Sequence, residues 1–258
     1  KEIEEKNTKI ISSIQYAKRI QSAILPPLGT VQKHLANSFV YFQPRDIVSG
    51  DFYWCANLEG RTILAAVDCT GHGVPGAFMS MIGSSLLNQI VYLNHVTAPH
   101  KILTALNLEI RKALKQEETA NQDSMDIAIC AILHETNTIE FAGARNPLFC
   151  LENGELEMVK GDRMSVGGSW YGKHKEFELH TIQAKPNQRF YIFSDGYRDQ
   201  FGGKAHNKLM MKGFRSLVSD ISQHPFEEQE ILLKDFFNNW KGKQRQTDDV
   251  LVIGFQLL

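Results

Sequence analysis

Four aspartates stand at the ends of apolar runs, and their side chains have the chemistry of a divalent-metal site. They are Asp51 in Ser-Gly-Asp-Phe, Asp68 in Val-Asp-Cys-Thr-Gly-His-Gly, Asp195 in Phe-Ser-Asp-Gly and Asp248 in Thr-Asp-Asp-Val. Carboxylate oxygens are ligands that Mg²⁺ and Mn²⁺ prefer, and the neighbouring glycines let backbone and substrate approach closely. Two such ions in one site can hydrolyse a phosphate ester without a covalent intermediate. The four aspartates therefore predict a two-metal hydrolytic centre.

Asp68 has the most informative surroundings of the four. It closes an apolar run, 63–67, and opens a glycine-containing turn before a helix that begins near Pro75. A carboxylate at such a strand end is placed to bridge two metals, and the exposed carbonyl of Cys69 could add a neutral oxygen ligand. His72 follows the turn and is a candidate donor of a proton to the leaving group. A histidine that caps the next helix or bonds a loop carbonyl explains His72 equally well.

The other three aspartates repeat this pattern. Asp195 follows the apolar run 189–193, and Asp51 precedes a strand, where it would bind one ion directly or through water. Asp248 and Asp249 are adjacent, and neighbouring residues of an extended chain point to opposite faces, so we expect only Asp248 to face the metals. Taken singly, each of these residues is explained as well by a solvated aspartate at a strand end.

Several further residues lie near these motifs. Arg45 could hold a phosphate oxygen, although a surface salt bridge is the simpler interpretation. Asp123 and Asp126 could reach an additional metal or could simply occupy a polar loop before a strand. The segment 142–147 predicts a tight turn between strands, and Gly202-Gly203 predicts a loop where a substrate lip could form.

Composition predicts a globular enzyme. The chain has 258 residues, of which 43% are hydrophobic and 22% charged, and its 28 basic and 29 acidic side chains give a net charge of −1. The totals therefore give no sign of a nucleic-acid partner. The cysteines at 55, 69, 130 and 150 lie far apart with no metal-binding spacing, which indicates reduced packing residues in a reducing compartment.

The sequence is cytoplasmic in character. We find no signal peptide and no apolar run that approaches the roughly 18 residues needed to span a bilayer. The chain opens on Lys1 and enters a charged helix at once. This start is compatible with a longer protein in which a sensor or a membrane anchor lies upstream.

Residues 2–25 predict one long helix with a single apolar seam. The seam residues recur at sevenfold spacing and are Ile3, Ile10, Ala17 and Ile24, supported by Ile14 and Ile20. Pro26-Pro27 ends the helix, because proline lacks a donor and disfavours helix in the preceding residue. The seam either packs on the core of the same chain or forms a coiled-coil linker that makes a homodimer and transmits a signal.

The elements that would position the aspartates alternate between strands and helix pairs. Short β-branched or aromatic runs predict strands at 39–42, 52–58, 62–67, 126–133, 138–141, 147–151, 177–181, 189–193 and 250–257. Apolar residues at helical spacing predict helices after Pro75 and Pro99, near 208–219 and over 226–240. Asn153-Gly154 predicts a hairpin. This order favours an α+β protein in which helices cover antiparallel sheets.

Taken in order, the motifs resemble a known family. Ser-Gly-Asp-Phe-Tyr-Trp at 49–54, Asp-Cys-Thr-Gly-His-Gly-Val-Pro-Gly-Ala at 68–77, Phe-Ser-Asp-Gly-Tyr at 193–197 and Thr-Asp-Asp-Val at 247–250 are similar to motifs of the PPM metal-dependent serine/threonine protein phosphatases. The resemblance is to the bacterial SpoIIE/RsbU-like branch, and it spans about residues 38–257. Each motif alone is of limited specificity, whereas the ordered set is strong.

The resemblance implies an αββα sandwich of two antiparallel sheets flanked by helices, with two Mn²⁺ or Mg²⁺ ions in a cleft at one edge. It divides the chain into a helical, coiled-coil linker, 1–27, and a phosphatase domain, 28–258. The implied metal ligands are Asp51, Asp68, the carbonyl of Cys69, Asp195 and Asp248. Members of this family often have glycine where this chain has Cys69, and a backbone ligand tolerates that change if the turn does.

The resemblance also implies a substrate and a mechanism. The branch removes phosphate from a phosphoserine or phosphothreonine of a small regulatory protein in partner switching, such as an anti-sigma-factor antagonist, and it often follows a sensor domain. A metal-bridging hydroxide, placed by Asp68, would attack the phosphorus directly, with His72 as a candidate acid.

Two other functions remain open at this stage. A catalytically silent module could bind a partner and pass on a conformational change, although the retained aspartates argue against it. A hydrolase of small phosphoesters or nucleotides would be expected to show a base-stacking pocket or a denser basic cleft, and the sequence shows neither clearly.

Overall fold

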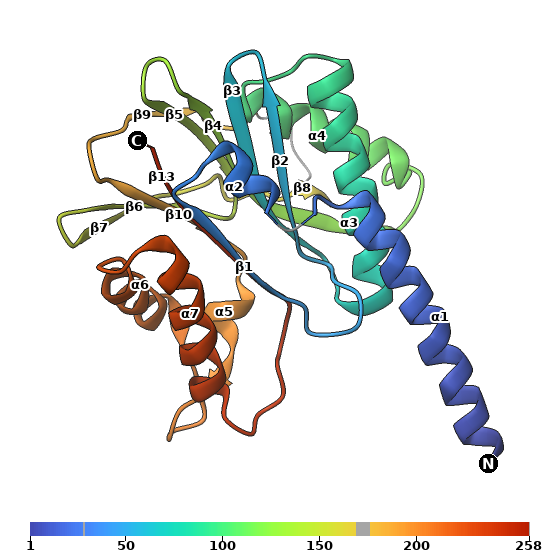
Figure 1. Ribbon diagram of the computed structural model, residues 1–258. Coiled ribbons are helices and arrows are strands. Elements are labelled where there is room, and N and C mark those ends of the chain that lie inside the picture. Colours follow the sequence, from blue (N-terminus) through green and yellow to red (C-terminus); the bar gives the residue numbers. More distant parts are fainter. Residues whose placement is uncertain (28, 169–175, 258) are drawn as a thin grey trace.

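Two antiparallel β-sheets pack face to face at the centre of the molecule (Figure 1). The computed structural model describes residues 1–27, 29–168 and 176–257. Leu28, at the predicted boundary between linker and domain, lies outside the described residues, and the division of the chain into two parts stays a prediction. The predicted α+β class and the αββα sandwich are confirmed.

In the described part of the chain, one sheet has five strands and the other has six. The first has the order β1-β13-β10-β6-β7, formed by β1 (Ser38–Gln43), β13 (Val250–Gln256), β10 (Arg189–Phe193), β6 (Leu148–Glu152) and β7 (Glu155–Val159). The second has the order β2-β3-β4-β5-β9, formed by β2 (Phe52–Leu58), β3 (Arg61–Cys69), β4 (Ser124–Leu133), β5 (Thr138–Ala144) and β9 (His180–Gln183). The short β8 (Val166–Gly167) pairs with β4.

The strands are apolar on both faces because both faces are buried. Along β3, Leu64 and Ala66 point into the core between the sheets, whereas Ile63 and Val67 point to the helices on the outer face. When both faces of a strand are covered, its sequence is a continuous apolar run. The run at 62–67 predicted a strand for this reason.

Helices cover the outer face of each sheet (Figure 1). The six-stranded sheet is covered by α3 (Gly73–Asn88) and α4 (Pro99–Ala113), and the five-stranded sheet by α6 (Met210–Ile221) and α7 (Phe226–Lys241). Shorter elements complete the described chain: α2 (Thr30–His34), α5 (Gly196–Asp199), β11 (Phe201–Gly202) and β12 (Asn207–Lys208). Sequence reasoning missed these four, because elements of two to five residues carry too little periodicity.

The expectation that no apolar run approaches the length of a membrane span needs correction. A π-helical turn, η1 (Gln89–Leu93), extends α3, so that Gly73–Leu93 forms one helical stretch of 21 residues with mean hydropathy 1.2. Length and composition alone would let it cross a bilayer. Half of its most apolar 18-residue window is buried, and Leu87 and Ile90 are fully enclosed in the core, so it packs as a core helix of the domain.

The N-terminal helix α1 (Glu2–Ile24) projects from the body of the molecule (Figure 1). Its apolar seam is open, with Ile3 75% and Ile10 58% exposed. The N-terminal part of the seam is therefore not packed on the core of its own chain, whereas Ile14 and Ala17 farther along the helix are half-buried. Whether the seam pairs with a second copy stays a prediction.

Local details confirm some predictions and shift others. Asn153 and Gly154 both have positive φ and join β6 to β7 as a two-residue hairpin, as their sequence predicts. The strand expected at 177–181 begins only at His180. All four cysteines are unpaired and buried, which agrees with a packing role.

Candidate metal centre

A cleft of about 260 Å³ contains the candidate chemistry. Its lining residues are Asp68, Cys69, Thr70, Gly71, His72, Ser124, Asp126, Arg145, Ser165, Asp195 and Asp248. They come from the ends of strands in both sheets and from the turns that follow them. The structure thus brings three of the four sequence-predicted aspartates to one cleft, and the fourth, Asp51, is buried nearby.

Asp68 and Asp195 meet across the two sheets. Asp68 is the second-last residue of β3 and lies directly opposite Asp126 of β4. Asp195 lies between β10 and α5. The backbone N–H of Asp195 donates to Oδ2 of Asp68 at 3.5 Å. Asp126 belongs to β4 itself, so the interpretation of Asp126 as a loop residue is wrong, and its register places it in the cleft.

Asp51 is buried, with 2% of its surface exposed, just before β2. Its Oδ2 atom has no hydrogen-bond partner among the residues that the structure describes. A buried carboxylate oxygen without a partner costs free energy, because nothing replaces the water that it has lost. Such an oxygen fits a cation ligand.

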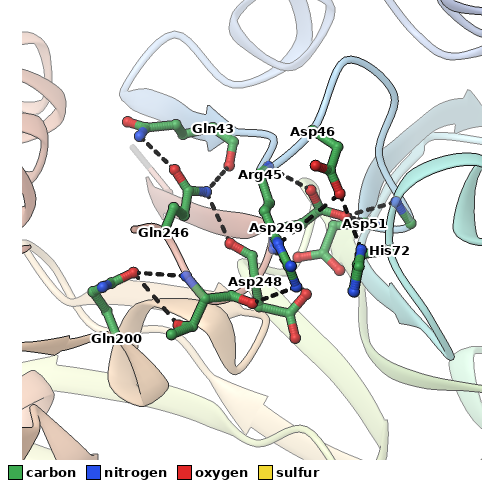
Figure 2. Close-up of polar contacts among 11 residues, drawn as sticks. Gln43, Arg45, Asp46, Asp51, His72, Gln200, Gln246, Asp248 and Asp249 are labelled. Carbon is green, nitrogen blue, oxygen red and sulfur yellow. Dashed lines mark hydrogen bonds and ion pairs between the residues drawn. The ribbon is translucent and has the colours of Figure 1, made fainter. Parts of the chain in front are cut away.

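Asp248 and Asp249 diverge, as the sequence predicts for neighbours in an extended chain (Figure 2). Asp248 lines the cleft, whereas Asp249 is buried and points to the loop before β2. Oδ1 of Asp249 accepts the N–H of Arg45 at 2.7 Å, and Oδ2 accepts the N–H of Gly50, also at 2.7 Å. Asp249 therefore fixes the loop that carries Asp51.

The electrostatics of the centre favour a bound cation. Burial raises the pKa of Asp51, and the charge of Asp68 raises it further. Burial likewise raises the pKa of Asp68, followed by the charges of Asp195 and Asp126. The pKa values of Asp195 and Asp248 are also raised, again mainly by burial. Carboxylates crowded in this way repel one another until a cation or protons neutralise them.

Cys69 can contribute its carbonyl only. Its side chain is buried in the core, and burial raises the pKa of its thiol well above the ordinary value. Gly50 and Gly76 pack against the carbonyl of Gly71 so tightly that a Cβ on either would collide with it. These glycines let the Asp51 loop and the start of α3 close around the turn that follows Cys69.

His72 and Arg45 both contact Asp46. Nε of Arg45 lies 3.9 Å from Oδ2 of Asp46, so the interpretation of Arg45 as part of a surface salt bridge is confirmed. Nδ1 of His72 lies 3.0 Å from Oδ2 of Asp46, and the His72 side chain makes no capping bond to α3 (Figure 2). Nη1 of Arg45 donates to the carbonyl of Thr247 at 2.9 Å. Both side chains remain partly exposed beside the cleft, and their roles in chemistry stay predictions.

Three functional candidates were missed. Arg145 occupies the tip of the predicted 142–147 turn with φ 60° and reaches the cleft, where its Nε lies 4.0 Å from Oδ2 of Asp126. Ser165 donates to Oδ1 of Asp126 at 2.6 Å. Gln21 of α1 contacts the loop before Asp51. Of these three residues, only Arg145 lies in a segment that the sequence analysis singled out, and that segment was predicted to be a turn.

Gln21 joins the N-terminal helix to the Asp51 loop. Its Nε2 donates to the carbonyl of Ser49 at 2.6 Å and to Oγ of Ser80 at 2.8 Å, while its Oε1 accepts the N–H of Ser49 at 3.2 Å. Gln21 is the buried residue of α1, with 5% of its surface exposed. The contact connects α1, α3 and the segment that leads into Asp51.

The donor set suits a hard divalent cation. The cleft offers carboxylate and carbonyl oxygens, and the orphaned Oδ2 of Asp51 lies nearby without a partner. In the described part of the chain, no three Asp, Glu, His or Cys side chains gather closely enough to enclose a metal by themselves. Mg²⁺ and Mn²⁺ commonly keep several waters and need only one or two carboxylates each, so the residues present fit such ions.

Comparison with known proteins identifies the class. The SiaA-PP2C domain of Pseudomonas aeruginosa has a similar structure with TM-score 0.88 and 28% identity, over 97% of this chain and 98% of that chain. The fold is thus that of the PP2C-type phosphatases. A family model described as Stage II sporulation protein E (SpoIIE) matches residues 58–257. The chain belongs to the SpoIIE family, and the resemblance seen in the motifs is confirmed.

More distant structures share the fold. The RsbU and RsbW domains of Rv1364c from Mycobacterium tuberculosis match with TM-score 0.66 and 14% identity, over 85% of this chain and 59% of that chain. RsbX in complex with magnesium matches with TM-score 0.56 and 18% identity, over 86% of this chain and 94% of that chain. A search of curated proteins gave no match.

Proposed function

We propose that this chain is a metal-dependent phosphatase that hydrolyses phosphoserine or phosphothreonine on a regulatory protein. The observation that carries the proposal is the convergence of Asp68, Asp195 and Asp248 on one cleft, with the partnerless Oδ2 of Asp51 beside it. Membership of the SpoIIE family and the PP2C-type fold support a phosphatase. The proposed ligands are the four aspartates and the carbonyl of Cys69.

Two Mn²⁺ or Mg²⁺ ions, when bound, would supply an activated water and neutralise charge on the phosphoryl group. RsbX, which shares the fold, has a crystal structure in complex with magnesium, and this supports the choice of a hard ion. The residues of the chain hold the geometry. Asp249 fixes the loop of Asp51 through two backbone N–H groups, and Asp68 accepts the N–H of Asp195.

A proton is needed at the leaving serine or threonine oxygen. His72 lines the cleft, and its Nδ1 is engaged with Asp46. We propose that Nε2 of His72 gives this proton, because the contact of Nδ1 with Asp46 fixes the orientation of the ring. Arg145, also in the cleft, brings a positive charge to the side of Asp126, where a phosphoryl oxygen would be stabilised.

The proposed substrate is a protein of a partner-switching system. The SiaA-PP2C domain shares this fold, and so does part of a chain that contains the RsbU and RsbW domains of Rv1364c; both likenesses support the proposal. We propose that the exposed seam of α1 makes a homodimer and that Gln21 transmits its state to the Asp51 loop. The four unpaired buried cysteines support a reducing, cytoplasmic setting.

The test is steady-state release of phosphate from five substrates in the presence of Mn²⁺: a phosphoserine, a phosphothreonine and a phosphotyrosine peptide of one sequence, an aryl phosphate and a nucleotide. We expect turnover of the first two to exceed that of the phosphotyrosine peptide. A folded protein that turns over none of them, with or without residues 1–25, would contradict the proposal and favour a silent binding module. Preference for a nucleotide over all peptides would favour a small-molecule hydrolase.

A further inference from the structure

The surface beside the cleft is strongly basic, although the chain as a whole is nearly neutral. Two segments, 198–208 and 240–247, together carry six Lys or Arg residues and one acidic residue, in a chain of net charge −1. The basic residues are Arg198, Lys204, Lys208, Lys241, Lys243 and Arg245. We call these six side chains the basic rim.

The two segments form one surface because they are bonded to each other. The N–H of Gly203 donates to the carbonyl of Trp240 at 2.9 Å, and Nε2 of Gln200 donates to the carbonyl of Arg245 at 3.0 Å. A Cβ on Gly202 would collide with the Trp240 carbonyl, so the β11–β12 hairpin lies directly on the C-terminal end of α7. Figure 1 shows both segments in the region below α5 and α7.

The surface adjoins the metal centre at both of its ends. Arg198 belongs to α5, which begins directly after Asp195. Thr247 directly precedes Asp248, and its N–H donates to Oε1 of Gln200 at 3.1 Å. A protein whose phosphorylated residue enters the cleft would therefore lie across this surface.

Most of the positive charge on the rim is uncompensated. Asp199, the acidic residue of the two segments, pairs with Arg198 at 3.7 Å and with Lys208 at 2.7 Å. Lys204, Lys243 and Arg245 are exposed and have no ion-pair partner among the described residues. A surface that only needed solubility would intersperse charges of both signs.

Two exposed apolar side chains accompany the charges. Phe201 is 41% exposed with Nζ of Lys208 5.8 Å from its ring centroid, and Met210 is 58% exposed. Aromatic residues, Met and Arg are enriched in protein interfaces, whereas an electrostatic footprint for nucleic acid needs no exposed Met. The mixture favours a protein partner.

We propose that the basic rim is the docking surface for an acidic region of the phosphorylated protein substrate. This inference rests on the proposed function, since it assigns the substrate of the same cleft. Opposite charges on the two surfaces would steer the substrate to the cleft and fix the orientation in which its phosphorylated residue enters.

The test compares the double variant Lys204→Glu/Lys243→Glu with a matched control, Lys101→Glu/Lys115→Glu, on exposed positions in and after α4. The probes are fluorescent phosphoserine peptides with either acidic or neutral flanks, and binding is followed by anisotropy. For the acidic peptide we expect the rim variant to weaken binding by about 10-fold or more at low ionic strength, and the effect to shrink in about 0.5 M salt. The control variant should bind as the wild type does.

Three results would overturn the inference: equal affinity for both peptides, an unchanged rim variant, or duplex DNA that competes as well as the acidic peptide. Turnover of an aryl phosphate separates this failure from failure of the proposed function. Normal turnover without peptide preference removes the docking surface alone. If the protein prefers the acidic peptide and the rim variant weakens this binding, but no substrate is turned over, the proposed phosphatase activity is wrong and the docking surface stands. Thermal melting verifies that both double variants fold.

Discussion

Oδ2 of Asp249 accepts the backbone N–H of Gly50 at 2.7 Å. Through this bond the residue before β13 holds the loop that carries Asp51. The two residues are 199 positions apart in the sequence. Asp249 is 1% exposed and lines no part of the cleft in the described structure. Of the two adjacent aspartates, Asp248 therefore lines the cleft and Asp249 positions Asp51.

We predict that Asp249→Ala weakens Mn²⁺ binding by about 10-fold or more, because residues that orient ligands typically contribute that much to metal affinity. The N–H groups of Arg45 and Gly50 would lose their acceptor, which costs about 2 kcal/mol of folding free energy. Isothermal titration calorimetry gives the affinity and urea denaturation gives the stability. Asp249→Asn, which keeps one acceptor oxygen, should fall between. An Asp249→Ala protein with wild-type affinity for Mn²⁺ would refute this positioning role.

The crowded carboxylates predict an unusual pH dependence for the metal-free protein. Burial and the charges of Asp195 and Asp126 raise the pKa of Asp68 above its ordinary value of 3.8. A group whose pKa is raised on folding favours the folded state when protonated, and this contribution is lost as the pH rises through the raised pKa. Asn at position 68 cannot ionise and escapes that loss.

We therefore expect Asp68→Asn to be more stable than the wild type in EDTA, by a margin that grows with pH from about pH 4 upward. Mn²⁺ should reverse the order at neutral pH, because only the wild type gains the full binding energy. Urea denaturation at several pH values, with and without Mn²⁺, measures both. If the two proteins differ in stability by the same amount at every pH in EDTA, the pKa of Asp68 is not raised on folding.

Gln21 predicts a mechanical link between α1 and the metal centre. Gln21→Ala removes the hydrogen bonds to Ser49 and Ser80 and leaves the buried N–H of Ser49 without this acceptor, at a cost of about 1–3 kcal/mol. We expect faster amide exchange at Gly50 and Asp51 and lower turnover. Gln15→Ala is the control, since Gln15 is exposed on the same helix. If Gln21→Ala and Gln15→Ala show the same amide exchange and the same turnover, Gln21 does not couple α1 to the cleft.

The open seam of α1 predicts self-association. Ile3 and Ile10 are separated by one heptad and are largely exposed, so burial against a second copy would remove apolar surface from water. Ile10→Glu should shift the protein toward monomer in analytical ultracentrifugation, whereas Lys9→Glu, off the seam, should not. A wild type that sediments as a monomer at high concentration would exclude the dimer.

The ends of the strands allowed much of the candidate site to be predicted. Asp68 and Asp195 follow runs that are apolar on both faces, and such runs indicate buried strands without knowledge of their partners. The roles of Asp249, Gln21 and Arg145 could not be predicted in this way. Each depends on a contact between segments distant in sequence or on a left-handed turn, and local patterns indicate neither which backbone group will lie opposite a side chain nor where a turn will point it.

The most direct test of the central claim is Mn²⁺-dependent release of phosphate from a phosphoserine peptide by the wild type, Asp68→Asn and Asp195→Asn. Asp220→Asn is the matched control, because Asp220 is exposed near the end of α6 and is not among the described residues that line the cleft. We predict turnover that requires the metal, falls roughly 100-fold or more in both cleft variants and stays unchanged in the control. Full turnover in EDTA, or equal turnover in all four proteins, would contradict a two-metal centre built on these aspartates.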